Sequence, residues 1–211
     1  IPWRRSPVPR DVLTALNRRS DVKGLAQALG HLGLLVLTGG AAWYAATRLP
    51  LIVFLAALYV HGAIWAFLLN GFHELCHKTV FRTKALNTVF LYIVSFLSWY
   101  NPVHFWASHQ EHHKYTPHPP DDLEVVLPVR LTVVDFLKVA VVSPWDFVKR
   151  LREYIRHALG RTAGDWENHL FPPAAVAERR ALFTWARIHL LGHAAIVAVS
   201  LATGQWLIPV L

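Results

Sequence analysis

Two histidine clusters in this chain have the spacing of metal ligands. The first, in the stretch GFHELCHKTVF, places His73 and His77 four residues apart. On a helix these imidazoles would project from one face about one turn apart, which is a spacing that can bind a metal ion. The pair alone would often be coincidence, because the chain contains 13 histidines.

The second cluster makes coincidence a poor explanation. In the stretch SHQEHHKYT, His109, His112 and His113 stand at positions i, i+3 and i+4, again on one face of a predicted helix. A surface that is merely rich in imidazole would not need to repeat this local geometry. Neutral imidazole binds iron, zinc, copper and nickel, so the residue type does not select the metal. The two clusters together predict a metal centre with histidine ligands.

The elements that must position these clusters are membrane spans. The chain is 54% hydrophobic and only 16% charged, which is too apolar for an ordinary soluble domain of 211 residues. A helix needs ~20 apolar residues to cross ~30 Å of hydrocarbon. The third of the four long runs contains Pro102, which leaves an apolar piece that is short for a crossing. The runs free of Asp, Glu, Lys and Arg are 24–47, 49–73, 85–110 and 188–211.

The basic residues predict which side of the membrane the clusters face. Six of them precede the first run and three follow the second, which is the positive-inside pattern and accounts for the net charge of +8 without a nucleic-acid partner. We therefore expect both clusters at the cytoplasmic face of an integral membrane protein, with a bacterial inner membrane as the compartment. The nine residues are Arg4, Arg5, Arg10, Arg18, Arg19, Lys23, Lys78, Arg82 and Lys84.

The expected fold is an all-α, polytopic membrane bundle in which a cytoplasmic helical cap carries the histidine clusters. If the clusters share one metal centre, the run 85–110 must begin and end on the same side, so it dips into the membrane or lies in its interface. We expect a single domain with this order: a lead over 1–23, two spans over 24–72, a site region with one short apolar segment over 73–180, and a further span over 181–211.

The two clusters resemble the histidine boxes of the integral-membrane fatty acid desaturases. An H-x-x-x-H box ends the second span, an H-x-x-H-H box follows one more apolar segment, and a Y-T…P-D-D-L-E tail comes next, so the resemblance covers about residues 30 to 130. It implies a non-haem di-iron centre, with His73, His77, His109, His112 and His113 as ligands. The family's third box is missing from residues 114–211. The resemblance therefore implies a fragment whose third box lies beyond Leu211.

The same resemblance implies the reaction and its partners. Acid–base residues cannot remove hydrogen from an unactivated methylene, whereas a redox metal with O₂ can. We expect O₂-dependent desaturation of a fatty acyl chain in the lipid bilayer, with electrons from an external donor of the ferredoxin, rubredoxin or cytochrome b5 type and its reductase. A membrane di-iron hydroxylase or a decarboxylating oxidase of alkyl or acyl chains would use the same ligands. The tight HQEHH spacing favours a desaturase over the alkane hydroxylases, whose second box contains an additional residue.

An alternative of another class is a membrane electron carrier that binds haem. Its axial ligands would come from His31, His61, His189 or His193, which lie inside or near the apolar runs. The boxes instead lie at charged span ends, where a bis-histidine haem is not expected. His189 and His193 also have i, i+4 spacing, and the two-box pattern gives them no role.

Several residues near the boxes have two interpretations. Carboxylates there, and His104, could hold the ligand imidazoles in place through hydrogen bonds, or could simply be solvated. Aromatic residues before the second box could line an acyl tunnel or anchor the chain in the membrane interface. The carboxylates are Glu74, Glu111, Asp121, Asp122 and Glu124, and the aromatic residues are Trp99, Tyr100, Phe105 and Trp106.

Overall fold

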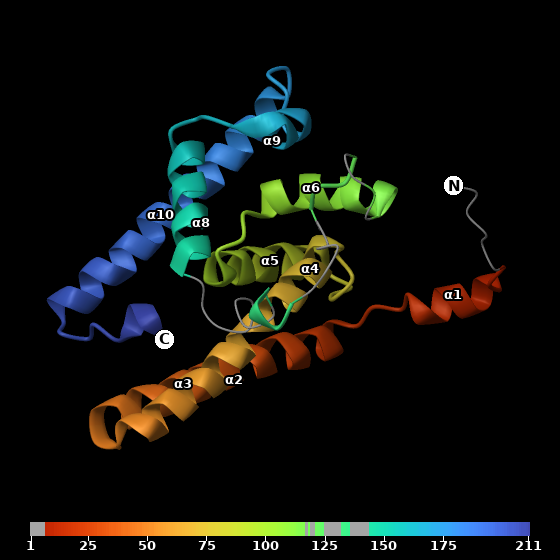
Figure 1. Ribbon diagram of the computed structural model, residues 1–211. Coiled ribbons are helices and arrows are strands. Elements are labelled where there is room, and N and C mark those ends of the chain that lie inside the picture. The colour runs from red at the N-terminus through yellow and green to blue at the C-terminus, as the bar shows by residue number, and fades with distance from the viewer. Residues whose placement is uncertain (1–6, 117, 119–120, 125–131, 136–143) are drawn as a thin grey trace. The chain divides into compact units, whose positions relative to one another are not determined.

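The computed structural model describes residues 7–116, 118, 121–124, 132–135 and 144–211 (Figure 1). Every regular element within these residues is helical, which confirms the all-α prediction. Three helical segments are long and apolar enough to cross a membrane: Asp21–Arg48, Leu51–Cys76 and Val176–Ala202. The chain divides into two compact units, Ile1–Ser98 with Leu211 and Trp99–Val210.

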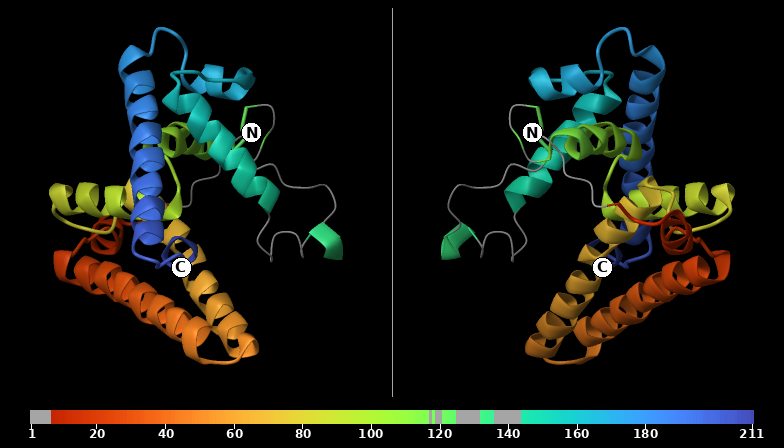
Figure 2. Two further views of the ribbon diagram at one scale, coloured as in Figure 1. Left: turned by 90° about the vertical axis from the view of Figure 1, so that its left-hand side faces the viewer. Right: turned by 90° about the vertical axis from the view of Figure 1, so that its right-hand side faces the viewer.

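The first unit is built on a hairpin of two long helices. Ser20 caps α2, and Pro50 precedes α3 and ends the tight turn between them. The two helices run side by side in opposite directions (Figures 1 and 2). Apolar side chains such as Leu37 and Tyr59 are 72% and 75% exposed, as expected of a surface that faces lipid. The helices of this unit are α1 (Arg10–Leu16), α2 (Asp21–Arg48), α3 (Leu51–Ala66), α4 (Leu68–Cys76) and α5 (Lys84–Ser98).

Polar contacts join the two helices of the hairpin. Nδ1 of His61 lies 2.8 Å from Oγ1 of Thr38, and Nε2 of His31 lies 3.1 Å from the carbonyl oxygen of Ile64. Gly39 allows the close approach, because a Cβ there would lie 3.2 Å from Cε1 of His61. His31 and His61 therefore both help to join α2 to α3.

The end of α4 is set by a turn with left-handed backbone geometry. Lys78 has a φ of 59°, and the N–H of Thr79 donates to the carbonyl of Glu74 at 3.3 Å, which is the hydrogen bond of a Schellman motif. Beyond this turn, Phe81 is fully buried against Gly24 of α2, where a Cβ would lie 2.6 Å from the Phe81 ring. This packing fixes the segment after α4 onto the first turns of α2.

The run 85–110 contains two helices. The first, α5, has 15 residues and would span only about 22 Å, which is short of the ~30 Å hydrocarbon core. It ends before Trp99, whose φ is 57°, and a new helix begins at Pro102 after Asn101. Neither helix of this run is long enough to cross a membrane by itself.

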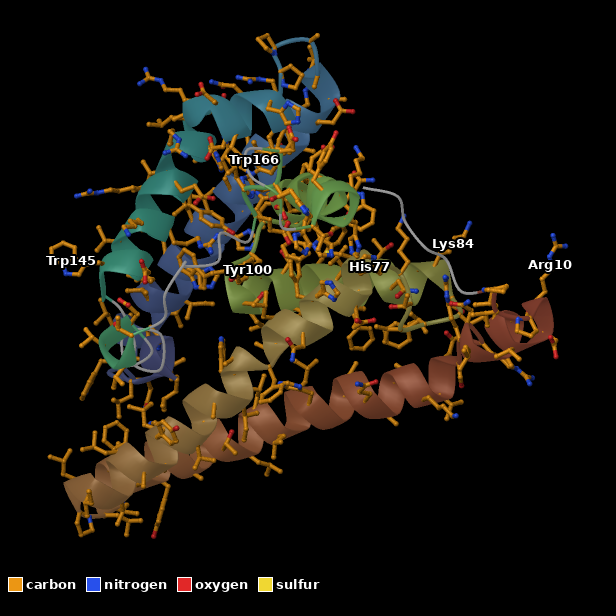
Figure 3. All side chains as sticks on the ribbon, turned by 45° about the vertical axis from the view of Figure 1, so that its right-hand side comes forward. Arg10, His77, Lys84, Tyr100, Trp145 and Trp166 are labelled. Atoms are coloured by element: carbon orange, nitrogen blue, oxygen red, sulfur yellow. The ribbon has the colours of Figure 1, made fainter. Side chains whose placement is uncertain are left out.

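The second unit packs its shorter helices against one long helix. Tyr154 of α8 and Leu182 and Ala186 of α10 are buried, and the guanidinium of Arg187 on α10 donates to the carbonyl of Ala158 at 2.8 Å. At the start of α8, Trp145 is 75% exposed and projects away from the helix (Figure 3). The helices are α6 (Pro102–Tyr115), α8 (Pro144–Ala158), α9 (Gly164–Leu170), α10 (Val176–Ala202) and the 3₁₀ turn η1 (Ile208–Val210).

The last span differs in its limits from the expected segment 181–211. Helix α10 begins earlier, at Val176, and ends at Ala202. Gly204 adopts a φ of 70°, and the N–H of Gln205 donates to the carbonyl of Ser200 at 2.7 Å, which closes the helix.

Candidate metal centre

The first histidine box occupies the last turn of α4. The ring centroids of His73 and His77 are 4.7 Å apart, and the two rings meet edge to face. A potential ligand nitrogen of each lies within 4.8 Å of the other. Both residues are half-buried, and Figure 3 labels His77 at this end of the helix. The Schellman turn at Lys78 stops the helix directly after the second ligand candidate.

A carboxylate inside this box contacts one of its histidines. Oε1 of Glu74 lies 3.3 Å from Nδ1 of His73, and Oε2 of the same side chain accepts a 2.9 Å hydrogen bond from Oγ1 of Thr79. This arrangement directs the N–H at Nδ1 of His73 toward the carboxylate. Its Nε2 is then the nitrogen with a lone pair for a metal ion.

The second box lies on α6 and brings two ring nitrogens together. Nε2 of His109 and Nε2 of His113 are 3.0 Å apart. Two imidazole nitrogens bound to one ion at ~2.1 Å and at right angles would be separated by about this distance. His109 is buried, whereas His113 is exposed. The rings of His112 and His113 are farther apart, with centroids 6.0 Å from one another.

Carboxylates from the segment after α6 hold two histidines of this box. Nδ1 of His109 donates to Oε1 of Glu124 at 2.7 Å, and Nδ1 of His112 donates to Oδ2 of Asp122 at 2.7 Å. Asp122 is fully buried, and its Oδ1 accepts the N–H of Glu124 at 2.9 Å. Such bonds fix the tautomer of an imidazole and leave Nε2 for a metal ion.

The other predicted carboxylates have different partners. Oε1 of Glu111 lies 2.6 Å from Nζ of Lys114, and its Oε2 lies 4.0 Å from Nε2 of His169. Asp121 is exposed, and its backbone N–H donates to the carbonyl of His118 at 3.2 Å. These two neighbouring acids thus have different surroundings. Asp122 contacts a box histidine, whereas Asp121 is directed to the surface.

His104 belongs to a different polar cluster in the second unit. Potential ligand atoms of His104, Glu153 and Glu167 lie within 4.8 Å of one another. Both oxygens of Glu167 are already engaged, since Oε1 accepts from Arg156 at 2.5 Å and Oε2 from the N–H of Ala163 at 2.8 Å. Glu167 thus belongs to an ion-pair network with Arg156 and His157 that connects α8 and α9, beside His104 and Glu153.

Ionisation in this network follows from burial and from its partners. Burial would raise the pKa of Glu167, but contacts with His157, Ala163 and Arg156 outweigh it and lower the pKa to about 2. Burial lowers the pKa of His104, which favours its neutral form. The network thus contains a permanent negative charge facing Arg156 at neutral pH.

The four aromatic residues before and within α6 face different partners. Trp99 lies against the His193 ring, with centroids 4.0 Å apart, and Arg150 stacks on Tyr100 at 4.7 Å. Phe105 stacks on His109, with centroids 4.9 Å apart, and Trp106 is 36% exposed. Of these four, Phe105 thus contacts a box histidine directly.

The paired histidines of α10 make hydrogen bonds within their own helix. Nδ1 of His189 lies 2.9 Å from the carbonyl oxygen of Trp185, and Nδ1 of His193 lies 2.9 Å from that of His189. His189 is fully buried and its ring faces Tyr154, with centroids 5.2 Å apart. Both rings are thus part of the packing between α10, α8 and Trp99.

One positioning residue, Asn101, was not anticipated from the sequence. Its Oδ1 accepts the N–H of Val103 at 3.0 Å and of His104 at 3.4 Å, which caps α6. Its Nδ2 donates to the carbonyl of Leu182 at 2.9 Å, which ties the start of α6 to α10. The Asn-Pro dipeptide was the available signal, because Asn favours the N-cap position and Pro the first helical position.

A family model described as "Fatty acid desaturase" matches residues 47–211, which include both histidine boxes. No curated protein and no solved structure matches the chain.

Proposed function

The chain belongs to the fatty acid desaturase family, and from this membership we propose that it catalyses O₂-dependent desaturation of a fatty acyl chain at a di-iron centre. The observation that carries the proposal is the second box. Its His109 and His112 each donate Nδ1–H to a carboxylate at 2.7 Å, which prepares both Nε2 atoms for metal binding.

The donor set fits iron as the metal. The ligands in this proposal are His73 and His77 from the first box and His109, His112 and His113 from the second. Imidazole is a common ligand of iron, and the 3.0 Å separation of Nε2 in His109 and His113 suits binding to one ion. When bound, the metal would supply the redox chemistry with O₂ that acid–base residues cannot provide.

The protein's own groups orient these ligands. Glu124 and Asp122 hold the Nδ1 protons of His109 and His112, which raises the basicity of each ring at Nε2. Phe105 stacks on the His109 ring at an interplanar angle of 18° and restricts its rotation. In the first box, Glu74 has the same relation to His73, at a longer distance of 3.3 Å.

The surroundings support a lipid substrate and a cytoplasmic electron donor. The three candidate spans support a location in a membrane, where acyl chains partition. Basic residues flank the helix ends next to the first box, which supports placing both boxes on the cytoplasmic side of a bacterial inner membrane. A soluble donor of the ferredoxin, rubredoxin or cytochrome b5 type would reach them there.

The proposal is tested by product analysis. Cells expressing the complete reading frame should convert a saturated fatty acid into a monounsaturated one, detected by gas chromatography and mass spectrometry. His109→Ala and His112→Ala should abolish the product, whereas His169→Ala, at an exposed histidine outside both boxes, should not. A hydroxylated or a shortened terminal-alkene product would instead assign the hydroxylase or the decarboxylating oxidase reaction. Turnover retained in His112→Ala would remove that residue from the site.

A further inference from the structure

A cavity of about 570 Å³ lies in the first unit, close to the first histidine box. Its walls come from the first turns of α2 and the residues before them, from α4, from the Thr79–Val80 segment and from Val94 of α5. This volume is within the range of ~300–1,000 Å³ that is usual for small-molecule sites. All of its walls belong to one compact unit.

One end of the cavity carries three cationic side chains. Arg18, Arg19 and Lys23 line it, and all three are exposed. Within the part of the chain that the structure describes, none of these side chains forms an ion pair with a carboxylate. They lie at the N-terminal end of α2, where the helix dipole also favours negative charge. This end of the cavity therefore suits an anionic group.

Farther along α2 the cavity is lined by apolar residues, with the polar side chains of His31 and Asn70 beside them. Leu32, Phe67 and Val94 line it, and Leu32 lies nine residues after Lys23 on α2, or roughly 14 Å along the helix. Along α2 the cavity wall thus changes from cationic to uncharged and mostly apolar. An amphiphile with an anionic headgroup and a hydrocarbon tail has the same polarity profile.

The cavity also reaches the turn of α4 that carries the first box. Gly71 and Glu74 line it, and Glu74 is the residue whose carboxylate lies 3.3 Å from Nδ1 of His73. A Cβ added to Gly71 would meet no atom within 4 Å, so the wall is open at this position. A tail in the cavity would therefore pass beside the first box.

We propose that this cavity binds the acyl substrate through its anionic headgroup, with Arg18, Arg19 and Lys23 contacting the negatively charged oxygens. This assignment rests on the proposed function and narrows its substrate class to acyl chains that carry a carboxylate or phosphate group. The positive-inside pattern alone would explain basic residues on this side of the membrane. That pattern does not predict that these three cations border a cavity leading to a histidine box. Variants that remove the same charge inside and outside the cavity wall distinguish headgroup binding from the positive-inside pattern.

The first experiment measures binding of radiolabelled palmitate to the protein from the complete reading frame, reconstituted in phosphatidylcholine nanodiscs. We expect saturable binding of one palmitate per chain. Arg18→Gln/Arg19→Gln/Lys23→Gln should weaken it about tenfold or more, because three charge contacts are lost. The control Arg10→Gln/Arg82→Gln/Lys84→Gln removes the same charge outside the cavity wall and should leave the affinity within about twofold. Equal weakening in both triple variants would show that only surface charge matters and would overturn the proposal.

The second experiment fills the cavity. Ala28 is half-buried and lines the wall, whereas Ala26 on the same helix is exposed and lies outside it. Ala28→Leu should weaken palmitate binding by about tenfold, and Ala26→Leu should have no effect. Thermal unfolding in detergent checks that both variants fold. Unchanged binding in a folded Ala28→Leu variant would exclude this cavity as the site.

Competition experiments identify which kind of acyl compound carries the anionic group: a free fatty acid, a coenzyme A thioester or a phospholipid. Palmitoyl-coenzyme A and dipalmitoyl phosphatidylglycerol are each tested against bound palmitate, with hexadecanol as the neutral control. Displacement by any of the anionic lipids at concentrations where hexadecanol is inactive supports the proposal and selects the carrier. Displacement by hexadecanol with equal potency would contradict it. Binding is measured without turnover, so the two proposals can fail separately. Desaturation without palmitate binding at this cavity would reject only the cavity, and palmitate binding without desaturation would reject only the proposed function.

Discussion

His112 and Asp122 are joined by a 2.7 Å contact between Nδ1 and a carboxylate oxygen whose side chain is fully buried. A buried carboxylate needs partners, and Asp122 has them in the His112 ring and in the N–H of Glu124 at 2.9 Å. The loop after α6 thus determines how one histidine of the second box is oriented.

Replacing this carboxylate should weaken the metal site without removing a ligand. Asp122→Asn should lower metal affinity by about 10–100-fold, because a neutral amide holds the Nδ1 proton less strongly. Iron retention during dialysis against a chelator measures the effect. Asp121→Asn is the matched control, since this neighbouring side chain is exposed. Equal iron retention in the two variants would show that the Asp122 contact does not support metal binding.

Asn101→Ala should destabilise the second unit by about 1–2 kcal/mol, because the variant loses the cap of α6 and the bond to Leu182. The shift in unfolding temperature in detergent measures this change. Asn17→Ala, at the exposed end of α1, serves as the control. If Asn101→Ala and the unmodified protein had equal unfolding temperatures, the cap would not stabilise α6.

Glu167 should make the stability of the folded protein depend on pH in the acidic range. Its pKa is lowered from 4.5 to about 2 in the folded state, so the unfolded chain binds the proton more readily. The stabilisation is therefore complete above about pH 4.5 and is lost as the pH falls from there toward 2. Glu167→Gln should lower the unfolding temperature at pH 7 and flatten its decline between pH 5 and pH 3. If the unfolding temperature of Glu167→Gln declined as steeply as that of the unmodified protein, other groups would cause the acid sensitivity. Glu178→Gln is the control, because it removes one negative charge at an exposed position.

The proposed di-iron centre takes ligands from both boxes, so it requires both boxes on one side of the membrane. Lys84 is exposed just after the first box, and Lys114 is 60% exposed directly after the second. In a Cys76→Ser background, Lys84→Cys and Lys114→Cys should both react with an impermeant thiol reagent from the cytoplasmic side only. Labelling from opposite sides would separate the two boxes by the bilayer.

The helices and the two boxes could be predicted from local sequence signals. Long uncharged runs identify spans, and i, i+3 and i+4 spacing places ligand candidates on one helical face. The break at Trp99 was harder to foresee, because an aromatic residue at a φ of 57° has no sequence signature. The Pro102 signal indicated a break nearby, but it did not show that α6 would be capped by Asn101.

The partners of the boxes depend on tertiary structure and could not be selected from the sequence. Asp121, Asp122 and Glu124 were equivalent candidates in one loop, and the backbone path of that loop decides which of them contacts a histidine. His104 was one candidate for supporting the ligand imidazoles, because it precedes the second box in the chain. The structure groups it with Glu153 and Glu167, which come from helices 49 and 63 residues later.

The most direct test of the central claim is Mössbauer spectroscopy combined with iron quantification on the protein from the complete reading frame. The account predicts two irons per chain that are magnetically coupled, and it predicts that His77→Ala and His112→Ala each disrupt the coupled pair, because each box contributes ligands to one centre. A single uncoupled iron, a haem absorption band, or a coupled pair that survives the loss of either histidine would contradict it.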